Sequence, residues 1–147
     1  MLSMYNSRNL AYVCTMLECI EKIFLYSNPF LSVEDFVWAN DQQNYNASWG
    51  LLLVIGEESK HLDPALKNAY SNIPWRNIAG MRNFLAHNYR GIDYDLVYEV
   101  ISTYLPNLKD VLINMIDQIE FDKELLKTAL DSVYYRHIQY LRSKLND

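Results

Sequence analysis

Apolar residues recur every three or four positions along most of this chain, the period of α-helices that bury one face. The clearest stripe lies in the first predicted helix, over about residues 6–26, at Leu10, Val13, Leu17, Ile20 and Phe24. No segment shows the sustained apolar–polar alternation of a half-buried strand. The pattern therefore predicts an all-α fold.

Turn and capping residues divide this pattern into separate helices. Asn28-Pro29 ends the first helix, and Ser32 before two acidic residues predicts the start of a short second one. Further helices are expected over about 44–61, from Pro74 to a stop at Arg90-Gly91, and from 95 onward with a kink or split at Pro106. Gly56, inside the second long helix, would allow a neighbouring helix to approach closely. These helices predict an up-and-down bundle.

The last predicted helix runs from about Asp122 to Leu145. Its expected buried face is a stripe at helical spacing made by Leu126, Leu130, Val133, His137, Leu141 and Leu145. We interpret His137 as a core or interface residue because it lies on this stripe.

Composition limits the class of protein. The 147 residues fit one domain, and half of them are hydrophobic, which excludes a disordered chain. No apolar run reaches the ~20 residues of a membrane span, and the N-terminus lacks a secretory signal pattern. Cys14 and Cys19 would point about 140° apart on one helix, so we expect buried, reduced thiols in a cytoplasmic protein.

The net charge of −5 opposes a protein that coats nucleic acid, but the charge is unevenly distributed. Residues 59–91 hold five basic residues against Asp63 alone, whereas the segments before and after are acidic. This local excess fits a phosphate-binding cleft used at one place. Ordinary solvated lysines and arginines are the alternative interpretation.

The basic stretch carries an Arg-x-x-x-x-His pair, Arg82 and His87. An imidazole can move a proton and a guanidinium can neutralise a phosphate, so the two side chains suffice for RNA cleavage without a metal. On one helix they lie about 140° apart, whereas Asn83, His87 and Arg90 share a stripe. One chain thus offers half-sites, and we expect a two-fold homodimer to join the motif helices of both chains across one cleft.

A longer signature surrounds the pair and resembles that of HepT-like toxins in the HEPN superfamily. It reads Ile73-Pro74-Trp75-Arg76-Asn77-Ile78-Ala79-Gly80-Met81-Arg82-Asn83, then His87-Asn88-Tyr89, then Ile92-Asp93; the upstream Ile55-Gly56-Glu57-Glu58 resembles a second family segment. The resemblance implies a HEPN-like bundle with its core over about 5–116. The remaining residues, about 118–147, would form an additional C-terminal helix within a single domain, 1–147.

The resemblance also implies a function: the toxin of a toxin–antitoxin pair, acting as a metal-independent endoribonuclease. His87 and Arg82 would be catalytic, and Asn83, Arg76 and Arg90 would support them or bind RNA phosphate. An MNT-type nucleotidyltransferase antitoxin would silence the enzyme by adding AMP to Tyr89. We expect no cofactor, no metal, and neither DNA nor membrane as partner.

Other interpretations stay open at this stage. The chain can instead be a non-catalytic HEPN module that binds its nucleotidyltransferase partner or a nucleotide. Arg82 can be an ordinary ion-pair residue, His87 an interface residue, and Tyr89 a packing residue. Glu57-Glu58 is a poor metal pair because adjacent helical side chains diverge by about 100°; we favour a helix-terminal or inter-helix contact for them, with Arg82 or Arg76 as candidate partners.

Overall fold

The computed structural model describes residues 5–87 and 93–146. The elements in chain order are α1 (Arg8–Ser27), α2 (Val33–Trp38), η1 (Ala39–Gln42), α3 (Gln43–Ser59), α4 (Pro64–Asn68), α5 (Trp75–Ala79), α6 (Met81–His87), α7 (Tyr94–Glu99), η2 (Val100–Tyr104), α8 (Leu105–Ile116), α9 (Lys123–Asp131), η3 (Val133–Tyr135) and η4 (Gln139–Leu145). The all-α prediction is confirmed: apart from one isolated bridge between Tyr5 and Ile119, the described residues form no strand pairing.

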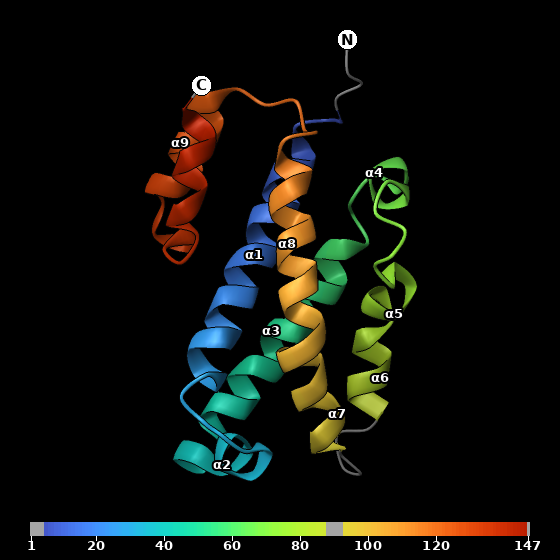
Figure 1. The fold of residues 1–147 in the computed structure, drawn as a ribbon, viewed down its shortest axis with the longest axis vertical. Helices are drawn as coiled ribbons and strands as arrows, with labels where there is room; N and C mark the ends of the chain where they lie inside the picture. The colour runs from blue at the N-terminus through green and yellow to red at the C-terminus, as the bar shows by residue number, and fades with distance from the viewer. Residues whose placement is uncertain (1–4, 88–92, 147) are drawn as a thin grey trace.

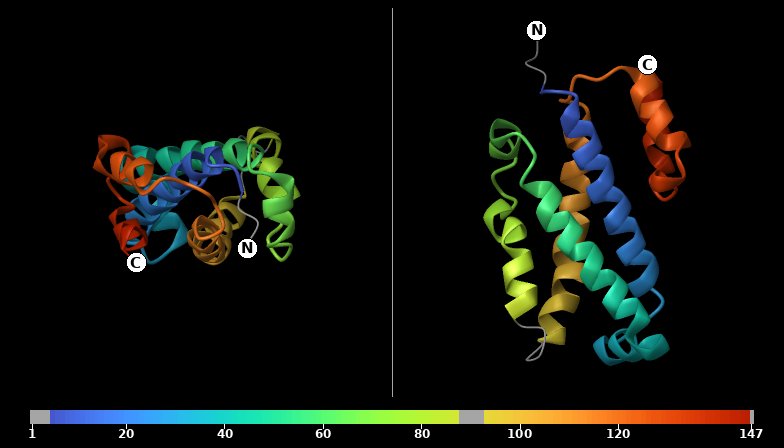
Figure 2. Two further views of the ribbon diagram at one scale, coloured as in Figure 1. Left: turned by 90° about the horizontal axis from the view of Figure 1, so that it is seen from above. Right: turned by 180° about the vertical axis from the view of Figure 1, so that it is seen from behind.

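Four rods run alternately down and up the molecule, as the bundle prediction requires (Figure 1). They are α1, α3, the pair α5–α6, and the continuous run α7–η2–α8. The first two pack tightly together, α8 packs on α1, and α5 and α6 pack on α3. Seen from above and from behind, α5–α6 and the C-terminal segment lie on opposite sides of the bundle (Figure 2).

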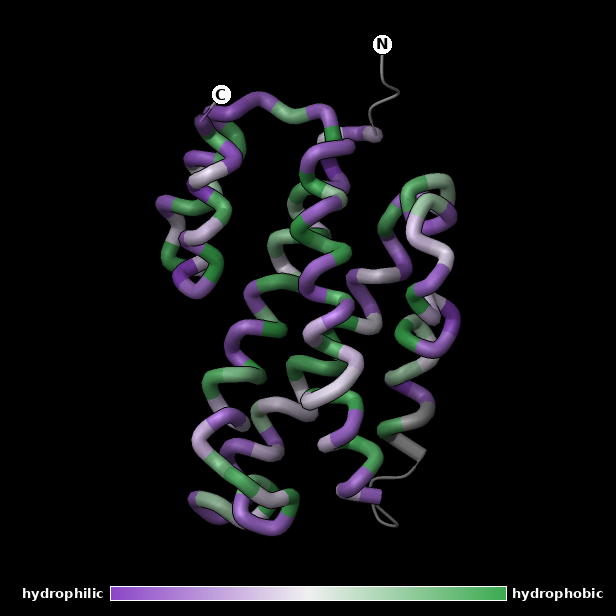
Figure 3. Tube along the Cα trace, viewed as in Figure 1, coloured by the Kyte–Doolittle hydropathy of each residue, from purple (hydrophilic) through white to green (hydrophobic). Residues whose placement is uncertain are grey.

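The core follows the predicted apolar stripe of α1. Leu10, Val13, Leu17 and Ile20 are all at most 2 % exposed, whereas Phe24 is only partly buried. Along the long helices, apolar positions alternate with polar ones around the axis (Figure 3). No helix in the described part of the chain is both long and apolar enough to cross a bilayer.

The predicted capping residue Ser32 starts α2, and Asp93 caps α7 in the same way. The Ser32 hydroxyl accepts a hydrogen bond from the Asp35 N–H at 3.1 Å, and the Asp93 carboxylate accepts one from the Leu96 N–H at 3.0 Å. Between α2 and α3, the residues Asn40, Asp41 and Gln42 all adopt left-handed backbone angles. No pattern along the chain predicted this turn, although Asn and Asp tolerate that conformation better than most residues.

Regular hydrogen bonding is interrupted before Pro106, while the rod itself continues. The π-helical turn η2 occupies Val100–Tyr104, and α8 begins at Leu105 with the proline in its first turn. Proline lacks an N–H and is tolerated in a first turn, where that group has no intrahelical partner. The predicted split at Pro106 is therefore present as a change of helix type.

The prediction of one motif helix from Pro74 onward is wrong. Gly80, with φ −83° and ψ 0°, ends α5, and α6 begins at Met81. The Gly80 N–H still donates to the Arg76 carbonyl at 3.0 Å, closing the last turn of α5. The predicted stop at Arg90-Gly91 lies outside the described residues.

The prediction of one C-terminal helix is also wrong, because the segment folds into a hairpin of α9, η3 and η4. Ser132 adopts an extended conformation (φ −74°, ψ 145°), and its hydroxyl accepts a hydrogen bond from the Tyr134 N–H. The reversal buries Leu130 and Leu141 but leaves Val133, a member of the expected stripe, 69 % exposed. The hairpin packs beside α1 (Figure 1).

Candidate functional site

The site begins at Trp75, which fixes the start of α5. Its indole N–H donates to the carbonyls of Lys67 and Tyr70, each at 3.1 Å. Those carbonyls belong to the end of α4 and the residues just after it, and they also accept the backbone N–H groups of Tyr70 and Ile73. The two hydrogen bonds of Trp75 therefore fix where α5 begins, and Ile73, just before it, is buried in the core.

Gly56 of α3 brings the two signature segments together. A Cβ placed on Gly56 would lie 2.8 Å from the Ile78 carbonyl oxygen and 3.6 Å from the Met81 Cβ. Only glycine leaves room for so close an approach of backbone. The predicted close contact at Gly56 is confirmed, and it seats the junction of α5 and α6 directly on α3.

Arg82, the second residue of α6, projects into solvent. Its side chain is 64 % exposed, and one guanidinium nitrogen lies 3.9 Å from a carboxylate oxygen of Glu57. Glu57 is itself 40 % exposed and also pairs with Lys60 at 3.2 Å. The predicted contact between Glu57 and Arg82 is present, but exposed pairs at such distances contribute at most about 1 kcal/mol. The guanidinium therefore remains available to an anionic ligand.

Arg76 and Asn83 are also exposed. Arg76 lies on α5, and its guanidinium makes no ion pair with any residue that the structure describes. Asn83 follows Arg82 on α6. The two arginines thus present positive charge on consecutive helices of an acidic protein.

The remaining predicted site residues lie at the end of α6 or outside the described residues. His87 is the last residue of α6, so its backbone lies five positions beyond Arg82 and about 140° around the helix; its side chain lies outside the described part. Tyr89 and Arg90 lie outside the described residues.

A cavity of about 700 Å³ opens between the α5–α6 rod and the η2–α8 rod. Its walls are mainly apolar, with a few polar side chains. The lining residues are Asn72, Ile73, Pro74, Arg76, Asn77, Ile78, Gly80, Met81, Leu96, Val100, Tyr104, Leu105, Asn107 and Leu108. The signature segment therefore forms one wall of a ligand-sized cavity.

The other histidines are engaged in structural contacts. His137 donates its backbone N–H to the Glu18 carboxylate at 2.8 Å, and its Nδ1 lies 2.5 Å from the same carboxylate. The His61 ring lies 5.2 Å from the ring of Tyr12. Within the described ranges, no three His, Cys, Asp or Glu side chains lie close enough to hold a metal ion.

The two cysteines lie in α1, away from this site. Both are buried and free, as predicted. Burial raises the pKa of the Cys14 thiol from 9.0 to about 12 and that of Cys19 to about 11, because a thiolate is disfavoured in apolar surroundings.

The up-and-down helical bundle and the exposed Arg82 on α6 fit the HEPN-like class that the sequence resemblance implies. The family model described as "Ribonuclease HepT-like" matches residues 16–115. The chain belongs to this family.

Several relatives carry ribonuclease names. The chain is 33 % identical to "Probable ribonuclease HepT" of Thermococcus cleftensis over 67 % of its own length and 86 % of the relative. It is 31 % identical to "Putative RNase MJ1216" of Methanocaldococcus jannaschii over 75 % of its length and 88 % of the relative. With "Putative RNase TTE0752" of Caldanaerobacter subterraneus it shares 38 % identity, over 54 % and 69 %. A comparison with solved structures gave no significant match.

Sequence reasoning missed the cavity residues outside the signature. Tyr104 and Asn107 line it from η2 and α8, well separated in sequence from the motif. They follow no motif spacing, so only the packing of the two rods could reveal them. The anchoring role of Trp75 also depends on packing and was not predicted. The available signal was a tryptophan between proline and arginine at a predicted helix start.

Proposed function

We propose that this protein is a metal-independent endoribonuclease and the toxin of a toxin–antitoxin pair. The observation that carries the proposal is Arg82: its guanidinium is mostly exposed and only weakly paired to Glu57, and its helix α6 packs on α3 beside Gly56, directly after the helix α5 that Trp75 anchors. Membership in the ribonuclease HepT-like family supports RNA as the substrate. Buried free thiols suit the reducing cytoplasm.

The proposed reaction is a transesterification within the RNA strand. His87 accepts the proton of a ribose 2′-hydroxyl, and the 2′-oxygen attacks the adjacent phosphorus. The bond from phosphorus to the 5′-oxygen breaks, and an imidazolium donates a proton to that leaving oxygen. Arg82 stabilises the charge that develops on the phosphoryl oxygens. The products are a 2′,3′-cyclic phosphate and a 5′-hydroxyl.

A homodimer would complete this site. Arg82 and His87 diverge around α6, so one copy does not direct both side chains at one phosphate. A two-fold axis beside α6 would place the arginine of each chain opposite the histidine of its partner. Asn83, Arg76 and Arg90 would then bind neighbouring phosphates. Light scattering on the purified protein measures whether the dimer forms.

Regulation by an antitoxin extends the proposal to Tyr89. The tyrosine oxygen would attack the α-phosphorus of ATP on an MNT-type nucleotidyltransferase, and pyrophosphate would leave. The attached AMP adds a bulky anion two residues from His87, where it competes with RNA phosphate. Intact-mass measurement before and after treatment with such a partner reports the added group.

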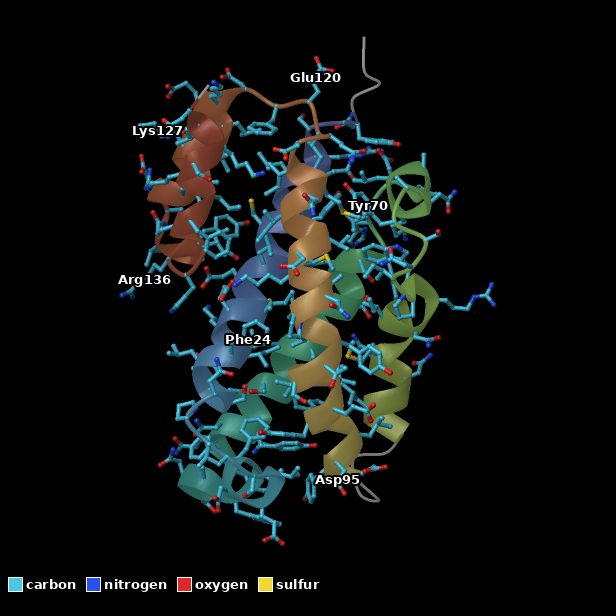
Figure 4. All side chains as sticks on the ribbon, in the orientation of Figure 1. Phe24, Tyr70, Asp95, Glu120, Lys127 and Arg136 are labelled. Carbon is cyan, nitrogen blue, oxygen red and sulfur yellow. The ribbon has the colours of Figure 1, made fainter. Side chains whose placement is uncertain are left out.

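Variants of the two motif residues test the activity. Replacing His87 with alanine should slow RNA cleavage by about 10²–10⁴-fold, the usual contribution of general acid–base catalysis. Arg82→Ala should slow it by roughly 10²-fold or more, since one charge-stabilising donor is lost. Arg136→Ala and His61→Ala are the matched controls; Arg136 lies at the hairpin, far from α6 (Figure 4). Wild-type rates in both motif variants would refute the proposal.

A non-catalytic binding module is the second candidate. The net charge of −5 and the ion pair between Arg82 and Glu57 favour it. It predicts that the unmodified dimer does not cleave RNA yet binds the nucleotidyltransferase with an affinity that depends on Arg82. Cleavage that needs Arg82 and His87 would exclude it.

A further inference from the structure

The cavity between α5–α6 and η2–α8 has the make-up of a ligand site. It measures about 700 Å³, within the range of roughly 300–1,000 Å³ typical of small-molecule sites. Its floor is apolar, formed by residues such as Ile78, Met81 and Leu108. Asparagines enter it from two sides, Asn72 and Asn77 from the motif segment and Asn107 from α8.

The asparagine side chains of the cavity have no hydrogen-bond partner among the described residues. The side-chain amides of Asn72, Asn77 and Asn107 form no hydrogen bond within the described part of the chain. By contrast, the amide of Asn114, two turns farther along α8, donates to the Asp110 carbonyl at 3.0 Å. These three side chains are exposed, so their amides can exchange water for a ligand that has a flat apolar face and an edge of donors and acceptors.

The charge of the lining points to an anionic ligand. Arg76 is the one charged residue among the described lining residues, and no carboxylate is among them. The whole chain carries a net charge of −5, so a cavity whose described lining has an arginine as its one charged residue differs in charge from the rest of the protein. A nucleotide satisfies all three requirements: a flat base, polar base edges and a phosphate.

The α8 side of the cavity carries an exposed aromatic ring. Tyr104, the last residue of the π-helical turn η2, lines the cavity and is 49 % exposed. Single π turns often mark functional positions in helices. Aromatic side chains at such positions stack on unpaired bases, at about 1–3 kcal/mol per base.

We propose that this cavity binds one unpaired nucleotide of the RNA strand beside the cleaved bond. The base stacks on Tyr104, the three asparagines contact its edge, and Arg76 contacts a flanking phosphate. The cavity wall ends at Met81 and the next residue is Arg82, so a strand seated here continues onto the motif. This inference rests on the proposed RNA substrate and makes the enzyme specific for single-stranded RNA.

Filling the cavity tests the inference in the full-length protein. In a His87→Ala background with EDTA, a labelled single-stranded RNA oligonucleotide is titrated against Asn107→Trp and Tyr104→Ala. We expect each change to weaken binding of the single-stranded oligonucleotide by about tenfold or more. The protein with an intact cavity should bind double-stranded RNA no more tightly than these variants do. Asn114→Trp, on the same helix and the same face but outside the cavity, is the matched control and should bind normally.

Two measurements distinguish the possible failures. Unchanged affinity in a folded Asn107→Trp protein overturns the inference, and so does a shift of that variant from dimer to monomer, because the cavity would then be an interface between two copies. Cleavage by the otherwise wild-type enzyme is measured separately. If cleavage is absent while binding still depends on Asn107 and Tyr104, the proposed catalysis fails and the nucleotide site stands.

Discussion

Arg82 is held less firmly than the two lysines of the basic stretch, Lys60 and Lys67. Lys60 pairs with Glu57 at 3.2 Å, and the Lys67 amine donates to the Ser59 carbonyl at 3.1 Å. The Arg82 guanidinium reaches Glu57 only at 3.9 Å and is 64 % exposed. An arginine in this state can exchange a weak partner for a phosphate at little cost, because both partners are already largely hydrated.

Sequence alone predicted that the Glu57-Glu58 segment contacts an arginine of the motif, and the pair of Glu57 with Arg82 confirms it. It did not identify the positions that hold the segments together. The Trp75 indole can donate hydrogen bonds to the Lys67 and Tyr70 carbonyls only because α4 ends between them. The position of that helix end depends on packing that no local pattern encodes.

The cysteines make a prediction at the same scale. With a pKa of about 12 for Cys14 and about 11 for Cys19, roughly one thiol in a thousand or fewer is ionised near pH 8, and the thiolate is the reactive form. Native protein should therefore react very slowly with Ellman's reagent, and unfolded protein should react at once with two thiols per chain. Rapid labelling of native protein would contradict the burial of these residues.

The same shifts set an alkaline limit on stability. The unfolded chain ionises its thiols near the ordinary pKa of 9.0, whereas the folded chain retains those protons until about pH 11–12. The contribution to the free energy of unfolding is thus complete below pH 9 and is lost as the pH rises through this window. Replacing Cys14 with serine should reduce this part of the alkaline loss, which urea titrations at several pH values measure.

At the scale of elements, helix starts were more predictable than helix breaks. Ser32 and Asp93 cap α2 and α7 through local hydrogen bonds, and such bonds are legible in sequence. The breaks at Gly80 and Ser132 depend on partners far along the chain. The motif rod packs on α3 at Gly56, and the C-terminal segment reverses so that both of its arms bury leucines.

The contact of α3 with the motif rod predicts opposite effects for two glycines of one helix. Gly56→Ala should lower the free energy of unfolding by about 1–3 kcal/mol, because its Cβ would lie 2.8 Å from the Ile78 carbonyl oxygen. Gly50 has nothing within 4 Å of an added Cβ, so Gly50→Ala should be neutral or stabilising by up to about 1 kcal/mol.

Urea unfolding of both variants measures these changes, and cleavage assays should show lower activity for Gly56→Ala alone. Equal stability of the two variants would contradict the close seating of α5 and α6 on α3.

For the whole molecule, the C-terminal hairpin buries a charged residue of α1. Glu18 is 5 % exposed and accepts the backbone N–H of His137, with Lys22 at 3.8 Å. Beside it, the Tyr140 hydroxyl donates to Glu21 at 2.7 Å, and Lys109 of α8 pairs with Glu21 at 2.8 Å. The hairpin is thus fastened to α1 by polar contacts on the side away from the cavity, and Glu21 also links α1 to α8.

These contacts predict that Glu18 stabilises the hairpin. Glu18→Ala should lower the free energy of unfolding by about 1–3 kcal/mol, because the N–H of His137 loses its acceptor in a partly buried place. Hydrogen exchange should rise over residues 123–145 more than over α3. Glu120→Ala, at the exposed end of the connection to the hairpin (Figure 4), should change stability by less than about 0.5 kcal/mol. Equal effects of the two changes would argue against this fastening.

The chemistry of the RNA ends tests the central claim most directly. Unmodified wild-type protein is incubated with RNA in excess EDTA, and the termini of the fragments are identified by mass spectrometry. The account predicts 2′,3′-cyclic phosphate and 5′-hydroxyl ends, which disappear with His87→Ala. Fragments with 5′-phosphate ends, or no cleavage by unmodified dimer, would contradict catalysis by Arg82 and His87.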